Sequence, residues 1–352
     1  MNPTRLLCLV CIVALAGCDE SDDTDAGGPR DAGSMSDDAG PGTDGGDSVD
    51  AGAPDGGVSA DAGDVDGGPG FVCTDAPDSD ALVCGSLGGV LAAGGASYVV
   101  RWMDVAQPDD MGLFSVGFDL DGMDSGAGSS ALDANCEEFN ADYTDDLTAM
   151  AGVDNAFGSL APTLESLTDG CLMHDVLTAP FADGDELLIV TVSGVDDMFS
   201  DPDVTVEISM ASVSSPPMLD ASSGLIAPGQ TFALGTSVGT FTGSLLDGRV
   251  DASGAGVTLR SGGSFLAADL ANARIAFDLC DDGLTSGVVA GAANVDDLVS
   301  AASALDPSAA DAVRAVFENV ADLNPSAGDP AICDDMSATY SFTAVPAVLV
   351  SP

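Results

Sequence analysis

The chain has 352 residues, of which 58 are acidic and 7 are basic, and its formal charge is −51 at pH 7. All the basic residues are arginine, so a P-loop lysine, a Schiff-base lysine and a Ser-Lys pair are excluded. Nucleic acids and anionic lipid surfaces are excluded as partners, because phosphate binding needs a basic surface. The charge favours cations or basic proteins as partners, or it simply keeps an exported protein soluble.

The N-terminus has the features of an export signal. Met1–Arg5 carries one positive charge, and the apolar run Leu6–Ala16 is too short for a membrane span, which needs about 20 residues. A short charged segment followed by a short apolar segment with small residues at its end is typical of a signal peptide. We therefore predict that residues 1–17 are a signal peptide.

Leu15-Ala16-Gly17-Cys18 resembles the lipobox of bacterial lipoproteins. The resemblance implies that the sulfur of Cys18 receives a diacylglycerol, that cleavage occurs before it, and that the new amino group is acylated. Two or three acyl chains give stable anchoring. The protein is then expected in the cell envelope, at the outer membrane, the cell surface or the periplasmic face of the inner membrane. A secretory signal that happens to contain a cysteine is the alternative, and it also predicts export.

Residues 19–70 are almost entirely Asp, Gly, Ala, Ser and Pro. So few large apolar side chains cannot offset the entropy cost of ordering the backbone. We predict that residues 18–70 comprise the lipidated Cys18 and a disordered Asp/Gly/Ala-rich tether with a reach of about 40 Å. The aspartates lack the regular spacing of calcium-binding nonapeptide repeats.

Residues 71–352 contain the six cysteines that remain after the signal peptide and Cys18: Cys73, Cys84, Cys136, Cys171, Cys280 and Cys333. An even number of cysteines in an oxidising compartment predicts three disulfides, although many pairings are open. We favour the pairs that close short or helix-bearing segments, which are Cys73–Cys84, Cys136–Cys171 and Cys280–Cys333. A zinc site is less favoured, because the sequence has no CxxC pair and its one histidine is His174.

Apolar alternation and β-branched residues predict most of this domain to be strands. Asp281-Asp282-Gly283 predicts a hairpin, and Leu246-Asp247-Gly248-Arg249 gives a second, weaker hairpin signal. Pro346 predicts that the last strand is an edge strand. The expected strands are 98–103, 113–118, 186–192, 203–208, 272–280, 284–289 and 337–350.

Fewer helices are expected. Asp306-Pro307 is typical of a helix start, and Asn294 can cap a helix that extends to about Leu305. Asp154 or Asn155 caps a third helix, which Pro162 is expected to divide or end. Segregated helices and antiparallel strands predict an α+β domain, with a predominantly antiparallel sheet and a few short helices, over residues 71–352.

Asp119, Asp121 and Asp124 lie close together around a glycine, as acidic residues do in calcium loops. Calcium takes several oxygen ligands, and further candidates follow nearby, at Asp133, Asn135, Asp142, Asp145 and Asp146. The spacing does not match an EF-hand. A second candidate metal cluster lies in a loop between two strands and consists of Asp196, Asp197 and Asp201, with Asp203 beside it. Ordinary turn and cap chemistry is the alternative for both clusters.

Three short motifs carry a second resemblance: Phe118–Gly122, Gly152–Asn155 and Ala227–Phe232. Together with the lipobox and the tether, they are similar to a set of uncharacterised lipoproteins from high-GC Gram-negative bacteria. The resemblance implies an envelope lipoprotein and no particular activity. For Gly152–Asn155 itself, a helix N-cap after a glycine turn is favoured over a ligand site.

The common catalytic motifs GxSxG, HExxH and GxGxxG are absent from the sequence. His174 lies next to a cysteine that we expect to be bridged, which favours a structural role over a catalytic one. We therefore predict a non-enzymatic binding or structural protein, stabilised by calcium. The alternative is a carboxylate-based hydrolase, which would hold two isolated acids beside Trp102 or a tyrosine.

Overall fold

The computed structural model describes residues 95–109, 111–123, 136, 142–145, 148–166, 177–184, 186–213, 215–259, 269–305, 310–329 and 332–350. All of these residues belong to one structural unit. The predicted signal peptide, Cys18 and the tether lie outside the described residues. The same holds for several candidate site residues, namely Cys73, Cys84, Cys171, His174, Asp124, Asp133, Asn135 and Asp146.

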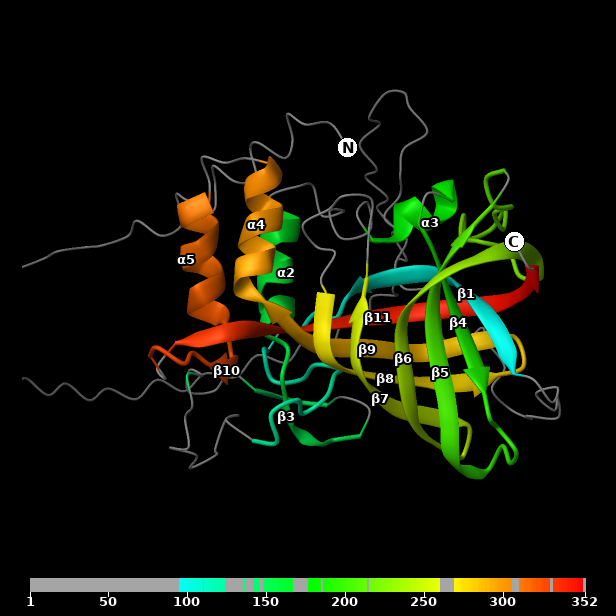
Figure 1. The fold of residues 1–352 in the computed structure, drawn as a ribbon, viewed down its shortest axis with the longest axis horizontal. Helices are drawn as coiled ribbons and strands as arrows, with labels where there is room; N and C mark the ends of the chain where they lie inside the picture. The colour runs from blue at the N-terminus through cyan, green and yellow to red at the C-terminus, as the bar shows by residue number, and fades with distance from the viewer. Residues whose placement is uncertain are drawn as a thin grey trace, which may run out of the picture. The chain divides into compact units, whose positions relative to one another are not determined.

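Eight strands of the described chain form a closed antiparallel barrel (Figure 1). The sheet runs in the order β1-β4-β5-β6-β7-β8-β9-β11, and β1 also pairs with β11, which closes it. The predicted antiparallel sheet with a few short helices is confirmed, and closure into a barrel is the additional finding. The strands are β1 (Ala96–Val105), β4 (Leu187–Ser193), β5 (Ser200–Ser212), β6 (Gln230–Leu246), β7 (Arg249–Thr258), β8 (Asp269–Cys280), β9 (Gly283–Asn294) and β11 (Cys333–Val350).

Apolar side chains fill the interior of the barrel. Aromatic rings from different strands meet there, and those of Phe277 and Phe342 pack edge to face with their centroids 6.3 Å apart. The space left between Val100, Leu188 and their neighbours is about 10 Å³, which is enough for at most one water molecule. The barrel is therefore a packed core, as is usual for small barrels.

Both predicted hairpins are confirmed. Asp247 and Gly248 connect β6 to β7 with φ values of 49° and 84°, and positive φ at both positions is what a tight two-residue turn requires. Asp281 and Asp282 connect β8 to β9, where Cys280 lies opposite Gly283. These turns set the register of two neighbouring strand pairs in the barrel wall.

The prediction that the last strand lies at an edge is wrong, because β11 pairs with β9 on one side and with β1 on the other. Pro346 lies opposite Tyr98 of β1. On its other side, pairing with β9 ends at Ala344, and a parallel pairing with β6 begins at Ala347. Pro346 thus falls between two ladders, so the N–H that proline lacks removes no ladder bond to β9 or β6.

The prediction of a strand at residues 113–118 is also wrong. This segment forms only isolated bridges, between Phe114 and Thr144 and between Phe118 and Asp154. Two short strands, β2 (Tyr143–Thr144) and β3 (Ala151–Val153), pair with each other beside it. Phe118, at the end of this segment, packs against residues of β8 and β9, whereas Leu113 and Phe114 are exposed.

The predicted helices form, with one difference. Helix α2 (Ala156–Ser166) begins after Asn155 and contains Pro162, so the proline does not end it. Helix α5 (Ala310–Val320) buries Val313 and Phe317, while Asp306-Pro307 lies outside the described residues. Two short elements complete the fold, α3 (Ala179–Asp183) and β10 (Leu323–Pro325). None of the helices in the described ranges is long and apolar enough to cross a membrane.

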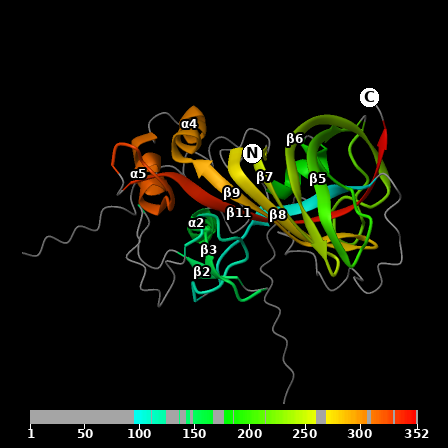
Figure 2. The same ribbon diagram turned by 60° about the horizontal axis from the view of Figure 1, so that its bottom comes forward.

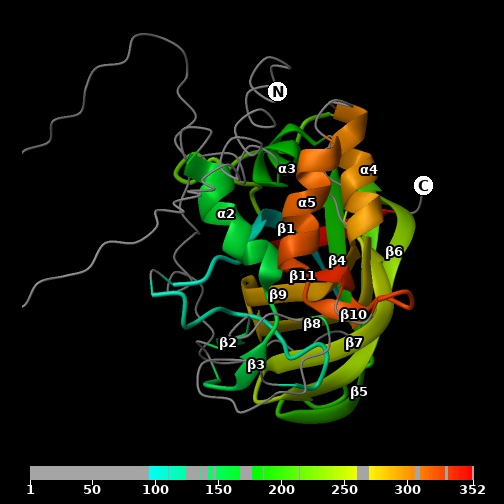
Figure 3. The same cartoon turned by 90° about the vertical axis from the view of Figure 1, so that its left-hand side faces the viewer.

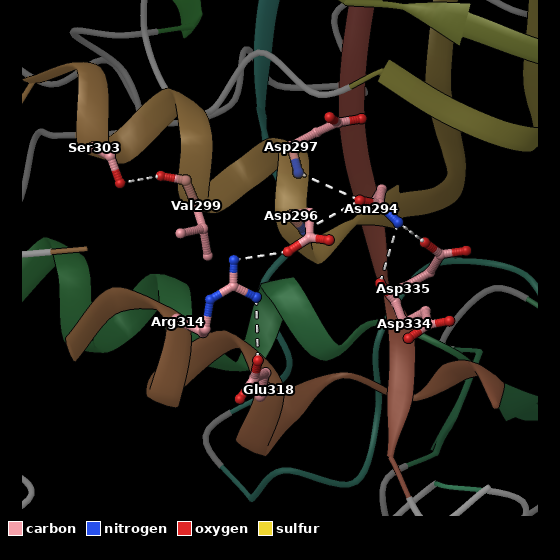
Figure 4. Close-up of polar contacts among 9 residues, drawn as sticks. All are labelled: Asn294, Asp296, Asp297, Val299, Ser303, Arg314, Glu318, Asp334 and Asp335. Carbon is pink, nitrogen blue, oxygen red and sulfur yellow. Dashed lines mark hydrogen bonds and ion pairs between the residues drawn. The ribbon is translucent and has the colours of Figure 1, made fainter. Parts of the chain in front are cut away.

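Helix α4 (Val295–Leu305) continues directly from β9 and lies beside α5, next to the start of β11 (Figures 2 and 3). Asn294 caps α4, since its Oδ1 accepts the backbone N–H groups of Asp296 and Asp297 at 3.1 and 3.3 Å. Figure 4 shows Arg314 of α5 reaching Asp296 of α4 at 2.7 Å and Glu318 of its own helix at 3.2 Å. The helix pair is therefore joined by a charged contact as well as by apolar packing.

Candidate functional site

The loop at residues 111–123 runs along the outside of the barrel over β8 and β9. Phe118 is buried there in a small apolar cluster that is separate from the barrel interior. The guanidinium carbon of Arg274 lies 4.5 Å from the centre of the Phe118 ring, and Arg274 also forms an ion pair with Asp251 at 3.2 Å. Apolar packing and one cation thus hold the loop on the wall. The strand residues that contact Phe118 in this cluster are Ala276, Val288 and Ala290.

Asp154 ties the same loop to the segment that leads into α2. Its backbone N–H donates to the carbonyl of Phe118 at 3.1 Å, and its Oδ2 accepts the backbone N–H of Leu120 at 2.5 Å. Asp154 is only 1% exposed. These two hydrogen bonds fix the Asp154 carboxylate and the loop relative to each other.

Three carboxylates converge at this point. Asp119, Asp121 and Asp154 each offer an oxygen, and these oxygens all lie within 4.8 Å of one another. Backbone N–H groups of Gly122 and Met123 occupy Oδ1 of Asp119 and Oδ1 of Asp121, at 2.6 and 2.8 Å. The Oδ1 atom of Asp154 is buried and has no hydrogen-bond partner among the described residues.

The electrostatic environment disfavours negative charge on Asp154 and Asp121. The pKa of Asp154 is raised to about 9, mainly by burial and to a smaller extent by the nearby carboxylates of Asp322, Asp142 and Asp121, against the lowering effect of the Leu120 N–H. Burial also raises the pKa of Asp121, with smaller contributions from Asp142 and Asp119. Without a cation, Asp154 therefore holds its proton at pH 7, and a bound cation would replace that proton.

Asp322 and Asp142 lie close enough to add to this charge and are themselves buried, at 4% and 7% exposed. Asp322 accepts the backbone N–H of Ser337 at 2.7 Å and also its hydroxyl. Ser337 Oγ in turn accepts the N–H of Ala156 at 2.7 Å, at the start of α2. Burial raises the pKa of Asp322 to about 7. These hydrogen bonds thus link β11, the segment between α5 and β10, and the first turn of α2.

The structure brings together Asp119 and Asp121 of the first predicted cluster, while Asp124 lies outside the described residues. Asp154 was predicted as a helix cap in preference to a ligand. The cap of α2 is instead Asn155, whose Oδ1 accepts the N–H of Gly158 at 3.2 Å. In the sequence, Asp154 was marked only by its place directly after Gly152-Val153. Asp322 was not marked by any comparable feature.

The second predicted cluster has a different arrangement. The carboxylate of Asp201 accepts the backbone N–H groups of Asp196, Asp197 and Asp203, at 2.5, 3.3 and 3.0 Å. These backbone bonds lower the pKa of Asp201. Within the described part of the chain, Asp196, Asp197 and Asp201 do not form a group of three converging carboxylates. The arrangement is that of a turn held by one aspartate.

The disulfide pairing differs from the one we favoured. Cys136 is bonded to Cys333, at the start of β11, across 197 positions of sequence. The predicted pairs Cys136–Cys171 and Cys280–Cys333 are therefore wrong, and Cys280 is bonded to a cysteine other than Cys333. The preference for short loops failed because the fold places the start of the last strand beside Cys136.

The fold and the cluster together define a class: an eight-stranded antiparallel barrel with a carboxylate cluster on the outside of its wall. Comparisons with known protein families, with curated proteins and with solved structures found no match to this chain. The function must therefore be argued from the residues themselves.

Proposed function

We propose that the chain is a lipid-anchored protein of the cell envelope with a non-enzymatic binding or structural role. In this proposal Cys18 carries the lipid, the acidic segment that follows acts as a spacer, and the barrel is the module held away from the membrane. The high negative charge of the chain favours a basic protein or a cation as its partner, rather than nucleic acid.

The packed interior of the barrel is the observation that carries the non-enzymatic part of this proposal. Barrels that carry small ligands enclose a cavity for them, whereas apolar side chains fill the interior described here and the gap beside Val100 and Leu188 is about 10 Å³. Recognition would then use the outer wall and the loops. This favours a binding surface or a structural module over a carrier of small molecules.

A carboxylate-based hydrolase is the second candidate, and one observation favours it. Asp142 and Asp322 lie close enough to Tyr143 to raise the pKa of its hydroxyl, in addition to the larger effect of burial. A buried acid with a raised pKa, as Asp322 has, is a common feature of active sites. The exposure of these acids, 7% and 4%, argues against the hydrolase because a substrate would have little access to them.

Metabolic labelling tests the lipid anchor. The full chain is expressed in a Gram-negative host with an alkyne-labelled fatty acid, alongside Cys18→Ser and the matched controls Cys8→Ser and Cys11→Ser in the signal peptide. We expect label and membrane fractionation for wild type and both controls, and loss of both for Cys18→Ser. Label that persists in Cys18→Ser, or that is missing from wild type, would overturn the proposal.

Protease added to intact cells then locates the barrel. If the barrel is displayed on the cell surface, the protease digests it on intact cells. If the barrel lies in the periplasm, it is protected until the outer membrane is opened. Protection that persists in spheroplasts would contradict export.

A further inference from the structure

We infer that Asp119, Asp121 and Asp154 form a binding site for a hard divalent cation, with calcium as the preferred ion. This site goes beyond the proposed envelope role and does not depend on the lipid anchor. The inference uses the separation of the carboxylate oxygens, the burial of Asp154, and the way in which the loop is fixed on the barrel wall.

The separations of the oxygens fit one ion. Calcium binds oxygen at about 2.3–2.6 Å, so two ligand oxygens on opposite sides of the ion are about 5 Å apart at most. The oxygens offered by the three carboxylates all lie within 4.8 Å of one another. These separations are close to those in the coordination shell of one calcium ion, so small side-chain rotations suffice for one cation to contact all three carboxylates.

Asp154 provides an observation that is independent of the clustering. Its side chain is 1% exposed, its Oδ2 is used by the N–H of Leu120, and its Oδ1 has no hydrogen-bond partner in the described residues. A buried acceptor without a partner is costly, and most such atoms in proteins are satisfied by protein, water or an ion. A cation between the three carboxylates would satisfy this atom.

Arg274, a basic side chain that contacts this loop, does not neutralise the cluster. Arg274 lies beside the loop, but its guanidinium contacts the ring of Phe118, the carboxylate of Asp251 and the backbone oxygen of Asp119. Its contact with Asp119 is therefore to a carbonyl, at 3.5 Å, and not to the carboxylate. The carboxylates remain available to a bound ion.

The donor set selects the kind of ion. All three ligands are carboxylates, which suit calcium, magnesium and manganese, whereas zinc prefers sites with histidine or cysteine. Asp119 and Asp121 come from one loop and Asp154 from another segment, and Gly122 lets the loop turn with φ at 82°. Such a mixed set fits the flexible coordination of calcium better than the strict octahedron of magnesium. Water and backbone oxygens would complete the coordination.

The test uses the full-length lipoprotein, purified in detergent and freed of metal with a chelator, and measures thermal unfolding in calcium or magnesium chloride. We expect 1 mM calcium to raise the melting temperature by several degrees, and magnesium to raise it less. Asp121→Asn and Asp119→Asn should remove most of the calcium shift. Asp282→Asn, in the exposed β8–β9 turn, should retain it. Because every variant keeps the aspartate-rich segment near the N-terminus, weak calcium binding there cancels from the comparison.

Asp154→Asn removes the buried carboxylate of the site, but it can also loosen the loop. We therefore check the fold of each metal-free variant by far-UV circular dichroism. A folded Asp154→Asn protein that no longer responds to calcium supports the site, and Asp121→Asn decides the matter if Asp154→Asn does not fold. No shift of wild type at 10 mM calcium would overturn the inference. A full shift in the Asp119→Asn/Asp121→Asn double variant would also overturn it.

Discussion

Leu120 donates its backbone N–H to Oδ2 of Asp154 at 2.5 Å, across 34 positions of sequence. This bond fixes the loop outside the barrel to the segment that starts α2. Oδ1 of Asp154 has no hydrogen-bond partner among the described residues, and one oxygen of this carboxylate lies within 4.8 Å of oxygens of Asp119 and Asp121. The position of one buried aspartate thus determines both where the loop lies and which carboxylates meet.

Arg274 should contribute to the stability of this loop. Arg274→Ala removes the contact with the Phe118 ring and the ion pair with Asp251, and we expect a loss of about 1–2 kcal/mol in the free energy of unfolding. Arg249→Ala is the matched control, because Arg249 forms a comparable ion pair with Asp278 at 3.0 Å on the same wall. Urea unfolding should give a loss of at most about 1 kcal/mol for the control. Equal losses for the two variants would show that the ring contact contributes nothing.

Asn155 should be among the most sensitive polar residues. It is fully buried, and besides capping α2 it donates from Nδ2 to the carbonyl of Ala106 at 2.7 Å and to Oγ of Ser115 at 2.8 Å. Asn155→Ala leaves buried groups without partners, and we expect a loss of about 2–4 kcal/mol. The more exposed cap of α4 provides the comparison, since Asn294→Ala should lose only about 1 kcal/mol in the same urea titration. A smaller loss at Asn155 than at Asn294 would contradict this account of α2.

The Cys136–Cys333 disulfide should stabilise the fold substantially, because it closes a very long segment of chain. The double variant Cys136→Ser/Cys333→Ser is expected to lose about 2–5 kcal/mol, measured by chemical unfolding without reductant. Peptide mapping under non-reducing conditions checks the pairing directly. A peptide that joins Cys333 to any cysteine other than Cys136 would refute it.

Asp322 should make stability depend on pH. Burial raises its pKa from the usual 3.8 to about 7, so the folded chain holds this proton more tightly than the unfolded chain does. The contribution of this group is fully present below about pH 4 and is lost as the pH rises to about 7. The full effect corresponds to roughly 4 kcal/mol of unfolding free energy.

Asp322→Asn removes this titration. We expect it to gain stability relative to wild type between pH 4 and pH 8, in metal-free buffer, when both are unfolded by urea. Asp282→Asn, in an exposed turn, should follow the wild-type pH dependence. A constant difference between Asp322→Asn and wild type across this range would show that Asp322 does not change its protonation there.

Local sequence patterns predicted the elements whose structure depends on residues a few positions apart. The β-branched residues of β4 and β5, the turns at Asp247-Gly248 and Asp281-Asp282, and the Asn294 cap all act over a few residues. Strand β6 was not predicted, because it is rich in Gly, Ser and Thr and much of it is exposed or half-buried. Closure of the barrel depends on pairing between β1 and β11, which lie far apart in the sequence, so no local pattern encodes it.

Two of the three carboxylates of the candidate site were predictable from the sequence. Asp119 and Asp121 stand out around Gly122, because acids beside a turn glycine are a recognisable local arrangement. The third carboxylate comes from another segment, and only the packing of Phe118 on the barrel wall brings the loop to Asp154. In a chain with 58 acidic residues, proximity in sequence could not distinguish this set from the Asp196–Asp201 turn.

Anomalous diffraction tests the central claim most directly. Crystals of the protein soaked in a low concentration of terbium, which substitutes for calcium, are measured at the terbium absorption edge. We predict one dominant anomalous peak between Asp119, Asp121 and Asp154, within coordination distance of Oδ1 of Asp154, and its displacement by excess calcium. No peak at the three carboxylates, or a dominant peak at Asp196, Asp197 and Asp201, would contradict the account.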